Sequence, residues 1–335
     1  MNIIIPMAGM GKRMRPHTLT TPKPLLKIAG KPIVQRLCEE IATVCASEIN
    51  EIGFIIGDFG KEVEQNLIDI AQKLGAVGKI YYQKEALGTA HAIMCAEPTL
   101  KGNVIVAFAD TLFEAGFKLD TNQDGIIWTQ EVENPSAFGV VKKNNDGTIH
   151  SFVEKPQTFV SNEAIIGIYY FRDGDNLKTE LQYIIEKDIK TLGEYQLTDA
   201  LQNMLDKGMQ FTTSNVKQWL DCGNKNATVS TNSRIIELKA KSESLIGGDV
   251  VKQNSIIVEP CFIGKGVRLI NSVVGPYVSL DDGVEVTNSV IESSIVGNKT
   301  TIENSVMSNS MLGCCVKLKG MKNDLSLGDY NEINL

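Results

Sequence analysis

Short units repeat along the C-terminal third of the chain, each an asparagine or serine followed by a serine and two apolar residues. They begin at Asn254, Asn271, Asn288, Ser293, Asn304 and Asn309. These starts are 17, 17, 5, 11 and 5 residues apart. A period near 17 with submultiples near 5 or 6 is typical of a hexapeptide-repeat β-helix. The alternative is an ordinary β-rich domain with chance Asn-Ser turns, and the regular spacing favours the β-helix.

The N-terminal two thirds of the chain has a different texture, in which short apolar runs alternate with helical patterns. The predicted strands are Ile3–Ile5, Ile52–Ile56, Ile80–Tyr82 and Val104–Phe108. Apolar residues recur at helical spacing over 33–44 and 63–74. This alternation predicts an α/β domain with a parallel sheet and helices on both faces. A chain of 335 residues suits two domains, which we place at 1–243, including a bridging helix over 225–241, and at 244–335.

A glycine loop rich in basic residues follows the first predicted strand. Residues 1–38 contain no acidic residue, although the formal net charge of the chain is −7. The loop and the turn after it carry Gly9, Gly11, Lys12, Arg13, Arg15, Lys23, Lys27 and Lys31. Glycine allows a ligand to approach the backbone, successive N–H groups bind anions, and Arg and Lys neutralise them. A local basic cluster in an acidic chain favours a small polyphosphate over a nucleic acid, which we do not expect as a partner.

Two common phosphate-binding patterns do not match this loop. The dinucleotide pattern fails because Met14 occupies the place of its third glycine. The Walker pattern fails because Pro6 replaces its first glycine and Arg13 its hydroxyl residue. What remains, from Gly9 through Arg13, Pro16, Thr18 and the run Pro22-Lys-Pro-Leu to Gly30-Lys-Pro32, resembles the opening signature of the sugar-1-phosphate nucleotidyltransferases. Its pattern is most similar to the glucose-1-phosphate thymidylyltransferase and uridylyltransferase group.

The resemblance implies a Rossmann-like catalytic domain with a mixed, mainly parallel sheet, followed by a left-handed β-helix. Coils of about 18 residues, as in hexapeptide-repeat proteins, would give about four coils here, and the polar tail after Gly320 shows no pattern. The resemblance also implies attack of a sugar-1-phosphate on the α-phosphorus of a nucleoside triphosphate, with pyrophosphate leaving. Positioning and charge stabilisation drive such chemistry. His17, His91 and His150 form no recognisable catalytic triad in the sequence.

Four residues are expected to carry the reaction. Asp110 follows the predicted strand Val104–Phe108, at the end of the run Val-Ile-Val-Ala-Phe-Ala-Asp, and resembles the metal-binding aspartate of the family, although Ala109 stands where many members have glycine. Asp221, in Trp219-Leu-Asp-Cys-Gly, resembles the second metal-binding aspartate. Mg²⁺ is the expected cofactor because it prefers carboxylate, phosphate and water oxygens. Arg13 and Lys23 match the residues that hold the triphosphate and stabilise the leaving pyrophosphate.

Two further groups of residues match the substrate-binding motifs of the family. For the nucleotide they are Ala8, Gly9, Gly11, Arg13, Gln83, Leu87 and Gly88, of which Gln83 and Gly88 would read the edge of uracil or thymine. For the sugar phosphate they are Gly139, Glu154, Lys155 and Tyr169, with Glu154 on sugar hydroxyls and Lys155 on the phosphate. Leu192 stands where short thymidylyltransferases commonly have an arginine, which puts the exact sugar phosphate in doubt.

Composition bounds the remaining possibilities. Without an apolar run of about 18 residues or a basic-apolar signal peptide, we expect no membrane association. The seven cysteines are scattered and form no C-x-x-C pair. Reduced thiols in a cytoplasmic protein are therefore expected. The β-helix is expected to mediate formation of a homo-oligomer, because the ends of a solenoid need covering.

Two other functions are alternatives to nucleotidyl transfer. A β-helix that transfers an acyl group generally needs a histidine, and no histidine follows His150. A non-catalytic regulatory subunit that binds sugar nucleotides is the second alternative. Such a protein would be expected to lack a metal-binding aspartate or the loop arginine, and Asp110, Asp221 and Arg13 are all present. The choice between dTTP and UTP stays open, because they differ by a ribose hydroxyl and a base methyl group, and apolar pockets discriminate a methyl group weakly. The choice among sugars stays open as well.

Overall fold

The computed structural model describes residues 1–45 and 47–334. Leu335, the last residue of the predicted range 244–335, lies outside the described residues. The chain forms two compact units, one of Met1–Gly9 with Leu37–Trp219, the other of Met10–Arg36 with Leu220–Leu335. The basic segment near the N-terminus therefore groups with the C-terminal part of the chain. The division after residue 243, which rested on the change in sequence texture, stays a prediction.

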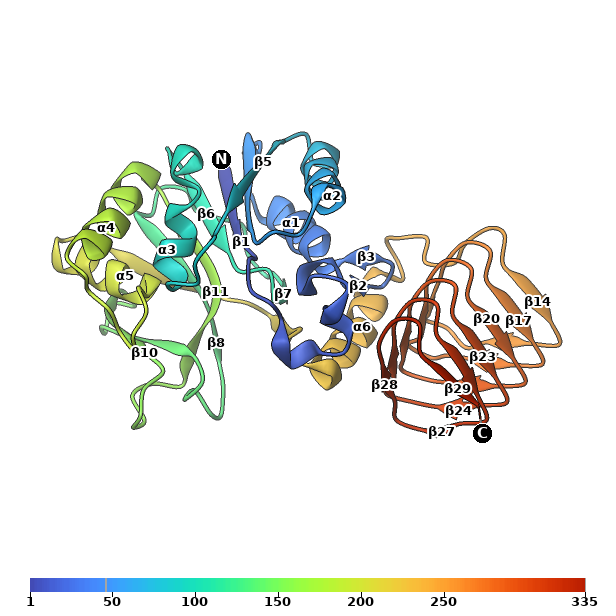
Figure 1. The fold of residues 1–335 in the computed structure, drawn as a ribbon. Helices are drawn as coiled ribbons and strands as arrows, with labels where there is room; N and C mark the ends of the chain where they lie inside the picture. The colour runs from blue at the N-terminus through green and yellow to red at the C-terminus, as the bar shows by residue number, and fades with distance from the viewer. Residues whose placement is uncertain (46, 335) are drawn as a thin grey trace. The chain divides into compact units, whose positions relative to one another are not determined.

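The first unit is built on a mixed sheet in the order β10-β9-β11-β6-β1-β4-β5, with β8 beside β11 and β12 beside β8 (Figure 1). The strands β6, β1, β4 and β5 are mutually parallel, and β11 is antiparallel to β6. The strands are β1 (Asn2–Pro6), β4 (Glu51–Ile56), β5 (Val77–Tyr82), β6 (Val104–Ala107), β8 (Gly125–Glu131), β9 (Gly139–Lys143), β10 (Ile149–Glu154), β11 (Glu163–Phe171) and β12 (Phe211–Asn215). All four predicted strands are confirmed, and so is the α/β fold class.

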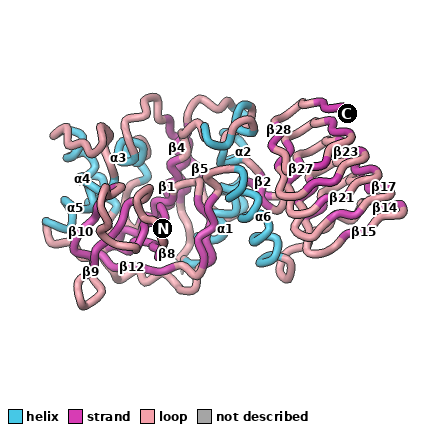
Figure 2. The backbone as a smooth tube through the Cα atoms, turned by 90° about the horizontal axis from the view of Figure 1, so that it is seen from below, coloured by secondary structure: helices cyan, strands magenta, loops and turns pink. Residues whose placement is uncertain are grey.

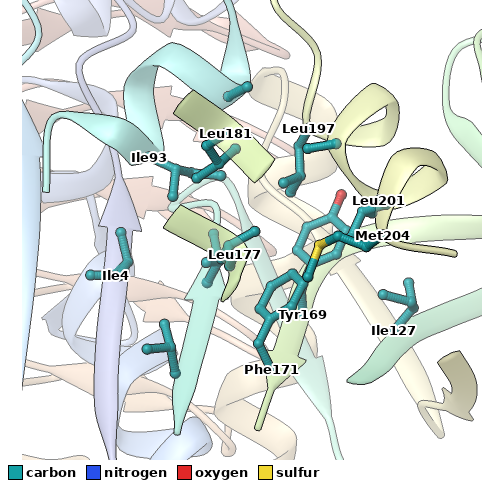
Figure 3. Close-up of a cluster of buried hydrophobic side chains, with 14 of the residues drawn as sticks. Ile4, Ile93, Ile127, Tyr169, Phe171, Leu177, Leu181, Leu197, Leu201 and Met204 are labelled. Carbon is teal, nitrogen blue, oxygen red and sulfur yellow. The ribbon is translucent and has the colours of Figure 1, made fainter. Parts of the chain in front are cut away.

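Helices connect the strands of this sheet, as the alternation of patterns predicted. They are α1 (Ile33–Val44), α2 (Lys61–Lys73), α3 (Thr89–Met94), α4 (Gly174–Glu186) and α5 (Leu197–Asp206). Figure 3 shows the core in which α3, α4 and α5 meet the sheet: Ile93, Leu181 and Leu201 come together with Tyr169 and Phe171 of β11. Burial of such side chains contributes roughly 1.5–3 kcal/mol each. This core fixes the strands whose ends carry the candidate site.

The second unit contains the basic segment and the helix α6 (Lys225–Lys239). The segment has only short elements: η1 (Lys12–Met14), η2 (His17–Leu19), η3 (Lys23–Leu25), β2 (Lys27–Ile28) and β3 (Lys31–Pro32). Helix α6 begins after Asn224, whose side chain accepts a hydrogen bond from the backbone N–H of Ala227 at 3.0 Å. It lies where the bridging helix was predicted and ends two residues earlier.

A left-handed β-helix, as predicted, makes up the rest of the second unit, and its strands are short and evenly repeated (Figure 2). One six-stranded and two five-stranded parallel sheets form its sides. The first sheet holds β14 (Val251–Gln253), β17 (Arg268–Ile270), β20 (Glu285–Thr287), β23 (Thr301–Glu303), β26 (Lys317–Lys319) and β29 (Glu332–Asn334). The second holds β15 (Ile256–Ile257), β18 (Val273–Val274), β21 (Val290–Ile291), β24 (Val306–Met307) and β27 (Lys322–Asn323). The third holds β16 (Phe262–Ile263), β19 (Ser279–Leu280), β22 (Ile295–Val296), β25 (Met311–Leu312) and β28 (Ser326–Leu327).

About four coils were expected up to Gly320, and the tail after it, which showed no pattern in the sequence, continues the β-helix. The strands β27, β28 and β29 follow Gly320 and extend all three sheets. This last turn pairs Lys317 with Glu332, fifteen positions on, and it lacks the Asn-Ser unit. Its shorter period concealed it in the sequence.

The repeated asparagines form one corner of the β-helix. Asn254, Asn271, Asn288 and Asn304 all have φ between 48° and 50°. Asparagine tolerates this left-handed region better than most residues. Each side-chain amide donates to the carboxamide oxygen of the next asparagine, at 3.0, 3.1 and 3.1 Å. The sequence repeat is therefore a repeated turn, joined from coil to coil by a ladder of hydrogen bonds.

Candidate active site

In the first unit, three of the predicted site segments leave the sheet at one edge. Strands β1, β5 and β6 run parallel, so their carboxyl ends share an edge, where ligands of α/β proteins bind. Ala8 and Gly9 follow β1, Gln83 follows β5, and Asp110 follows β6. The backbone N–H of Gln83 donates to Ile56 at 2.9 Å and so continues the register of the sheet. The fold therefore places these residues where the resemblance predicted a nucleotide.

The loop from Gln83 to Gly88 is held by the segment around Tyr195. Tyr195 donates its N–H to the carbonyl of Leu87 at 2.9 Å, and its own carbonyl accepts from Ala90 at 2.9 Å. Gly88 has φ 120°, and a Cβ atom there would lie 2.4 Å from the Tyr195 carbonyl oxygen. The Gln83 amide reaches the carbonyl of Gly88 at 3.4 Å. Only glycine fits here, and the amide of Gln83 lies beside the start of α3.

The predicted sugar-binding residues Gly139, Glu154 and Tyr169 come together on β9, β10 and β11. Glu154 pairs with Gly139 across β10 and β9, and a Cβ on Gly139 would lie 3.1 Å from Oε2 of Glu154. Burial raises the pKa of Tyr169, and the negative charge of Glu154 raises it further. The ammonium of Lys155 lies 3.6 Å from Oε1 of Glu154, with half of its side chain exposed. The carboxylate of Glu154 and the exposed ammonium of Lys155 thus lie together, with the carboxylate beside Gly139 of β9.

Sequence reasoning missed the residues that hold Glu154 and the loop from Gln83 to Gly88. We call this loop the base loop, because the resemblance predicts that it binds the base. Thr198 donates its hydroxyl to Oε2 of Glu154 at 3.3 Å. Its neighbour Leu197 donates its N–H to Oγ1 of Thr89 at 2.8 Å. The segment 195–198 therefore contacts both the predicted base loop and the predicted sugar group. The sequence signal that could have found them is their position in the segment Gly193–Asp199, which directly follows Leu192.

Trp219 belongs to the first unit and packs beside the residues that are predicted to bind the sugar phosphate. Its ring meets that of Phe138 edge-on at 4.9 Å, and Phe138 directly precedes Gly139. The indole Nε1 donates to Oγ1 of Thr111 at 3.4 Å, the residue that follows Asp110. The tryptophan of the W-x-D motif thus orders the chain next to one predicted metal-binding aspartate.

In the second unit, the glycine loop and Lys23 lie against one another. Gly11 has φ 56°, and a Cβ there would lie 2.9 Å from Cβ of Lys23. The hydroxyl of Thr18 donates to the Gly11 carbonyl at 2.9 Å. Lys23 is 7% exposed, whereas Arg13 is exposed on η1. A buried lysine thus packs against a glycine turn that carries an exposed arginine, and such basic glycine turns are able to bind anions.

Asp221, also in the second unit, is exposed and ordered by its own turn. Its Oδ1 accepts from the N–H of Gly223 at 2.9 Å, and its carbonyl accepts from the hydroxyl of Thr231 at 2.7 Å. Over residues 1–45 and 47–334, no group of three or more His, Cys, Asp or Glu side chains is arranged to hold a metal ion. The carboxylate of Asp221 offers hard oxygens, the type of ligand that Mg²⁺ prefers.

The family model for nucleotidyl transferases matches residues 2–237. A glucose-1-phosphate thymidylyltransferase of Streptomyces antibioticus is 31% identical over 318 residues, covering 88% of this chain and 87% of that protein. A glucose-1-phosphate thymidylyltransferase of Streptomyces griseus is 26% identical over 362 residues, covering 100% of this chain and 99% of that protein. A crystal structure of UDP-glucose pyrophosphorylase with UDP-glucose has a TM-score of 0.56 and 23% identity, covering 71% of this chain and 98% of that one. The similarity to this crystal structure shows that the two chains share a fold.

In the first unit, the carboxyl edge of the parallel strands lies beside the loop from Gln83 to Gly88, and the second unit contains the basic glycine turn at Gly11. These features are typical of enzymes that bind nucleotides. The chain belongs to the nucleotidyl transferase family. The predicted family and the predicted nucleotidyl transfer are confirmed. Among the described residues, no helix is both long and apolar enough to span a membrane.

Proposed function

We propose that the protein transfers a nucleotidyl group from dTTP or UTP to glucose-1-phosphate, releasing pyrophosphate. The observation that carries the proposal is the arrangement of Gln83 and Gly88 at the edge of the parallel strands, with Gly139, Glu154 and Tyr169 grouped on the adjoining β9–β11. The two Streptomyces relatives are named for this reaction with dTTP. The amide of Gln83 suits the edge of a pyrimidine.

Each substrate has its own set of residues in this proposal. Arg13 and Lys23 bind the triphosphate and stabilise the charge on the leaving pyrophosphate. Glu154 accepts hydrogen bonds from sugar hydroxyls, and Lys155 pairs with the sugar phosphate. The nucleophile is a phosphate oxygen that already carries charge, so no general base is required.

We propose Mg²⁺ as the cofactor, held by Asp110 and Asp221. When bound, it would neutralise charge on the phosphates. Both carboxylates are hard ligands, and the phosphates and water would complete the shell that Mg²⁺ prefers. The remaining work, orienting two anions so that one attacks the other, falls to Arg13, Lys23 and Lys155.

The test is pyrophosphate release measured over a grid of dTTP, UTP, ATP and GTP against glucose-, galactose- and N-acetylglucosamine-1-phosphate. We expect the highest kcat/KM for a pyrimidine triphosphate with glucose-1-phosphate. A purine preference would refute the role of Gln83. An absence of turnover with any pair would favour the regulatory-subunit alternative.

We also propose that the β-helix associates with a second copy of the chain. Ile256, Val273, Val290 and Val306 occupy matching positions of adjacent strands β15, β18, β21 and β24. Three of them are 61%, 44% and 49% exposed, for Ile256, Val290 and Val306. The asparagine corner lies two residues before each and is uncharged. A self-complementary patch of this kind is what a twofold dimer uses.

Light scattering of the whole protein tests this association. We expect the mass of a dimer or higher oligomer, and a lower mass for Val290→Lys with Val306→Lys. A monomeric wild-type protein would refute it. We further propose a cytoplasmic location, because none of the seven cysteines forms a disulfide.

A further inference from the structure

The segment Met10–Arg36, which carries Arg13 and Lys23, has almost no regular structure of its own. Before Ile33, where α1 begins, it contains three three-residue 3₁₀ turns and a pair of two-residue strands. Elements this short are not stable alone in water. The conformation of the segment must therefore come from what it contacts, and it lies in the same compact unit as the β-helix.

One contact joins the end of the segment to the coil that contains β19. The ammonium of Lys27 lies 2.9 and 2.7 Å from the two carboxylate oxygens of Asp281, which directly follows β19. Two residues on, the N–H of Ala29 donates to Oδ1 of Asn232 at 2.9 Å, and the same oxygen accepts from Ser279 of β19 at 2.7 Å. Asn232 and Ser279 are buried. Lys27 is thus tied to a rigid coil by a bidentate pair beside a buried hydrogen-bond network.

A second contact joins the middle of the segment to the last described coil. The hydroxyl of Thr20 donates to Oδ2 of Asp329, and Nε2 of His17 lies 3.2 Å from Oγ of Ser326. Oδ1 of Asp329 accepts from the N–H of Cys314 at 2.6 Å, which fixes its carboxylate to the preceding coil. His17 is 3% exposed. The turn at residues 17–20 is therefore held on the side of the β-helix.

These two contacts flank Lys23. It lies three residues after Thr20 and four before Lys27, and Arg13 lies four residues before His17. We propose that Asp281 and Asp329 of the β-helix are positioning residues for nucleotidyl transfer, because they hold the segment in the conformation that presents Lys23 and Arg13 to the triphosphate. This inference rests on the proposed role of Arg13 and Lys23. The β-helix then serves catalysis, besides the association proposed above.

The expected effect is kinetic. An exposed ion pair contributes little to stability, whereas misplacing a charged group by about 1 Å can reduce the rate about 100-fold. Loss of both anchors should therefore lower kcat/KM for the nucleoside triphosphate much more than it lowers the melting temperature. The KM for the sugar phosphate should stay unchanged, because Glu154 and Lys155 lie in the other unit.

The experiment compares the whole protein with Asp281→Asn, Asp329→Asn and the double variant. The matched control is Glu303→Gln, which breaks the 3.4 Å ion pair between Glu303 and Lys319 within the β-helix. We expect kcat/KM for the triphosphate to fall about 10- to 100-fold in the double variant and to be unchanged in the control. Reversing the pair, with Lys27→Asp and Asp281→Lys together, should recover most of the activity that Lys27→Asp alone loses. Thr20→Val, which removes one hydroxyl, replaces Asp329→Asn if that variant does not fold.

Wild-type kcat/KM for the triphosphate in the double variant would overturn the proposal. So would an equal loss for both substrates, or no recovery in the reversed pair. Arg13→Ala and Lys23→Ala separate this outcome from failure of the proposed function. If these two variants lose activity while the anchor variants keep it, only the positioning role is wrong. If these two keep full activity, the assigned roles of Arg13 and Lys23 are wrong, and the positioning proposal falls with them.

Discussion

The carbonyl oxygen of Tyr195 occupies the space that a side chain on Gly88 would need, 2.4 Å from the position of a Cβ atom. The backbone fixes the position of that Cβ atom, and the atom that it would meet is a backbone oxygen, so no rotamer change relieves the clash. This contact fixes the start of α3 against the segment that reaches Glu154. Any residue larger than glycine must displace the base loop.

Gly88→Ala should therefore raise the KM for the nucleoside triphosphate by at least about 10-fold, with a smaller effect on the KM for the sugar phosphate. The clash moves the loop that holds Gln83, and alanine also disfavours φ 120°. Gly75→Ala is the matched control, since Gly75 has φ 75° but open space around its Cβ position. Equal kinetics in the two variants would show that the clash does not matter.

Asp110→Asn and Asp221→Asn should each lower kcat at least about 100-fold, because each removes a preorganised charge and keeps the shape. Asp146→Asn, in an exposed turn where Asp146 accepts from Thr148, is the control. EDTA should abolish wild-type activity and Mg²⁺ should restore it. Near-normal turnover in Asp110→Asn, or full activity in EDTA, would refute the metal assignment.

Lys155→Ala should raise the KM for the sugar-1-phosphate and leave that for the triphosphate near its wild-type value. Thr198→Val should act in the same direction but more weakly, since it removes only the 3.3 Å bond that orients Glu154. Initial rates with each substrate varied in turn measure both effects. A selective effect of Lys155→Ala on the triphosphate would reverse our placement of the two anions.

The stability of the protein should depend on His17 between pH 6.5 and 4. Burial lowers the pKa of His17 to about 4, Asp329 opposes this and Lys225 adds to it. The pKa in the folded state lies below the unfolded value of about 6.5, so the unfolded chain takes up the proton first as the pH falls. The free energy of unfolding should fall by about 3 kcal/mol by pH 4 from this group alone.

Urea unfolding of wild type and His17→Gln at pH 7 and pH 4.5 measures this contribution. The variant should lose less stability on acidification than the wild type. His150→Gln, which alters an exposed histidine on β10, should behave like the wild type. A parallel fall in all three proteins would exclude His17 as the source.

The asparagine ladder predicts a graded loss of stability. Asn271 both donates to Asn288 and accepts from Asn254, whereas Asn254 only donates within the ladder. Asn271→Ala should cost about 2 kcal/mol and Asn254→Ala about half of that, because the two share the same backbone conformation and differ in the bonds lost. Urea unfolding of the two variants gives the ratio.

Much of the fold could be read from the sequence because its periodicities are local. The parallel strands β1, β4 and β6 are nearly continuous apolar runs, and β1 has Ile3, Ile4 and Ile5 fully buried. The Asn-Ser units predicted the β-helix because each marks a left-handed corner. The last coil was missed because its shorter period carries no such unit.

The contacts that hold the site were harder to predict. Thr198 and Glu154 are 44 residues apart, and Lys27 and Asp281 are 254 apart. A single sequence shows which residues could form such bonds, but the pairing depends on packing between distant segments. The residues expected to touch substrate came from a motif, while the residues that orient them came only from the structure.

The two anchors on the β-helix also limit how this chain can vary in length. Asp281 follows β19 and Asp329 follows β28, and β19, β22, β25 and β28 stack as successive strands of one sheet. A coil inserted or deleted between them would move one anchor by a whole strand spacing, about 4.8 Å, while the segment from Thr20 to Lys27 kept its length. Coils before β16 are free of this restraint. The β-helix should therefore tolerate an additional coil before β16 but not one between β19 and β28. A coil added by protein engineering belongs before β16.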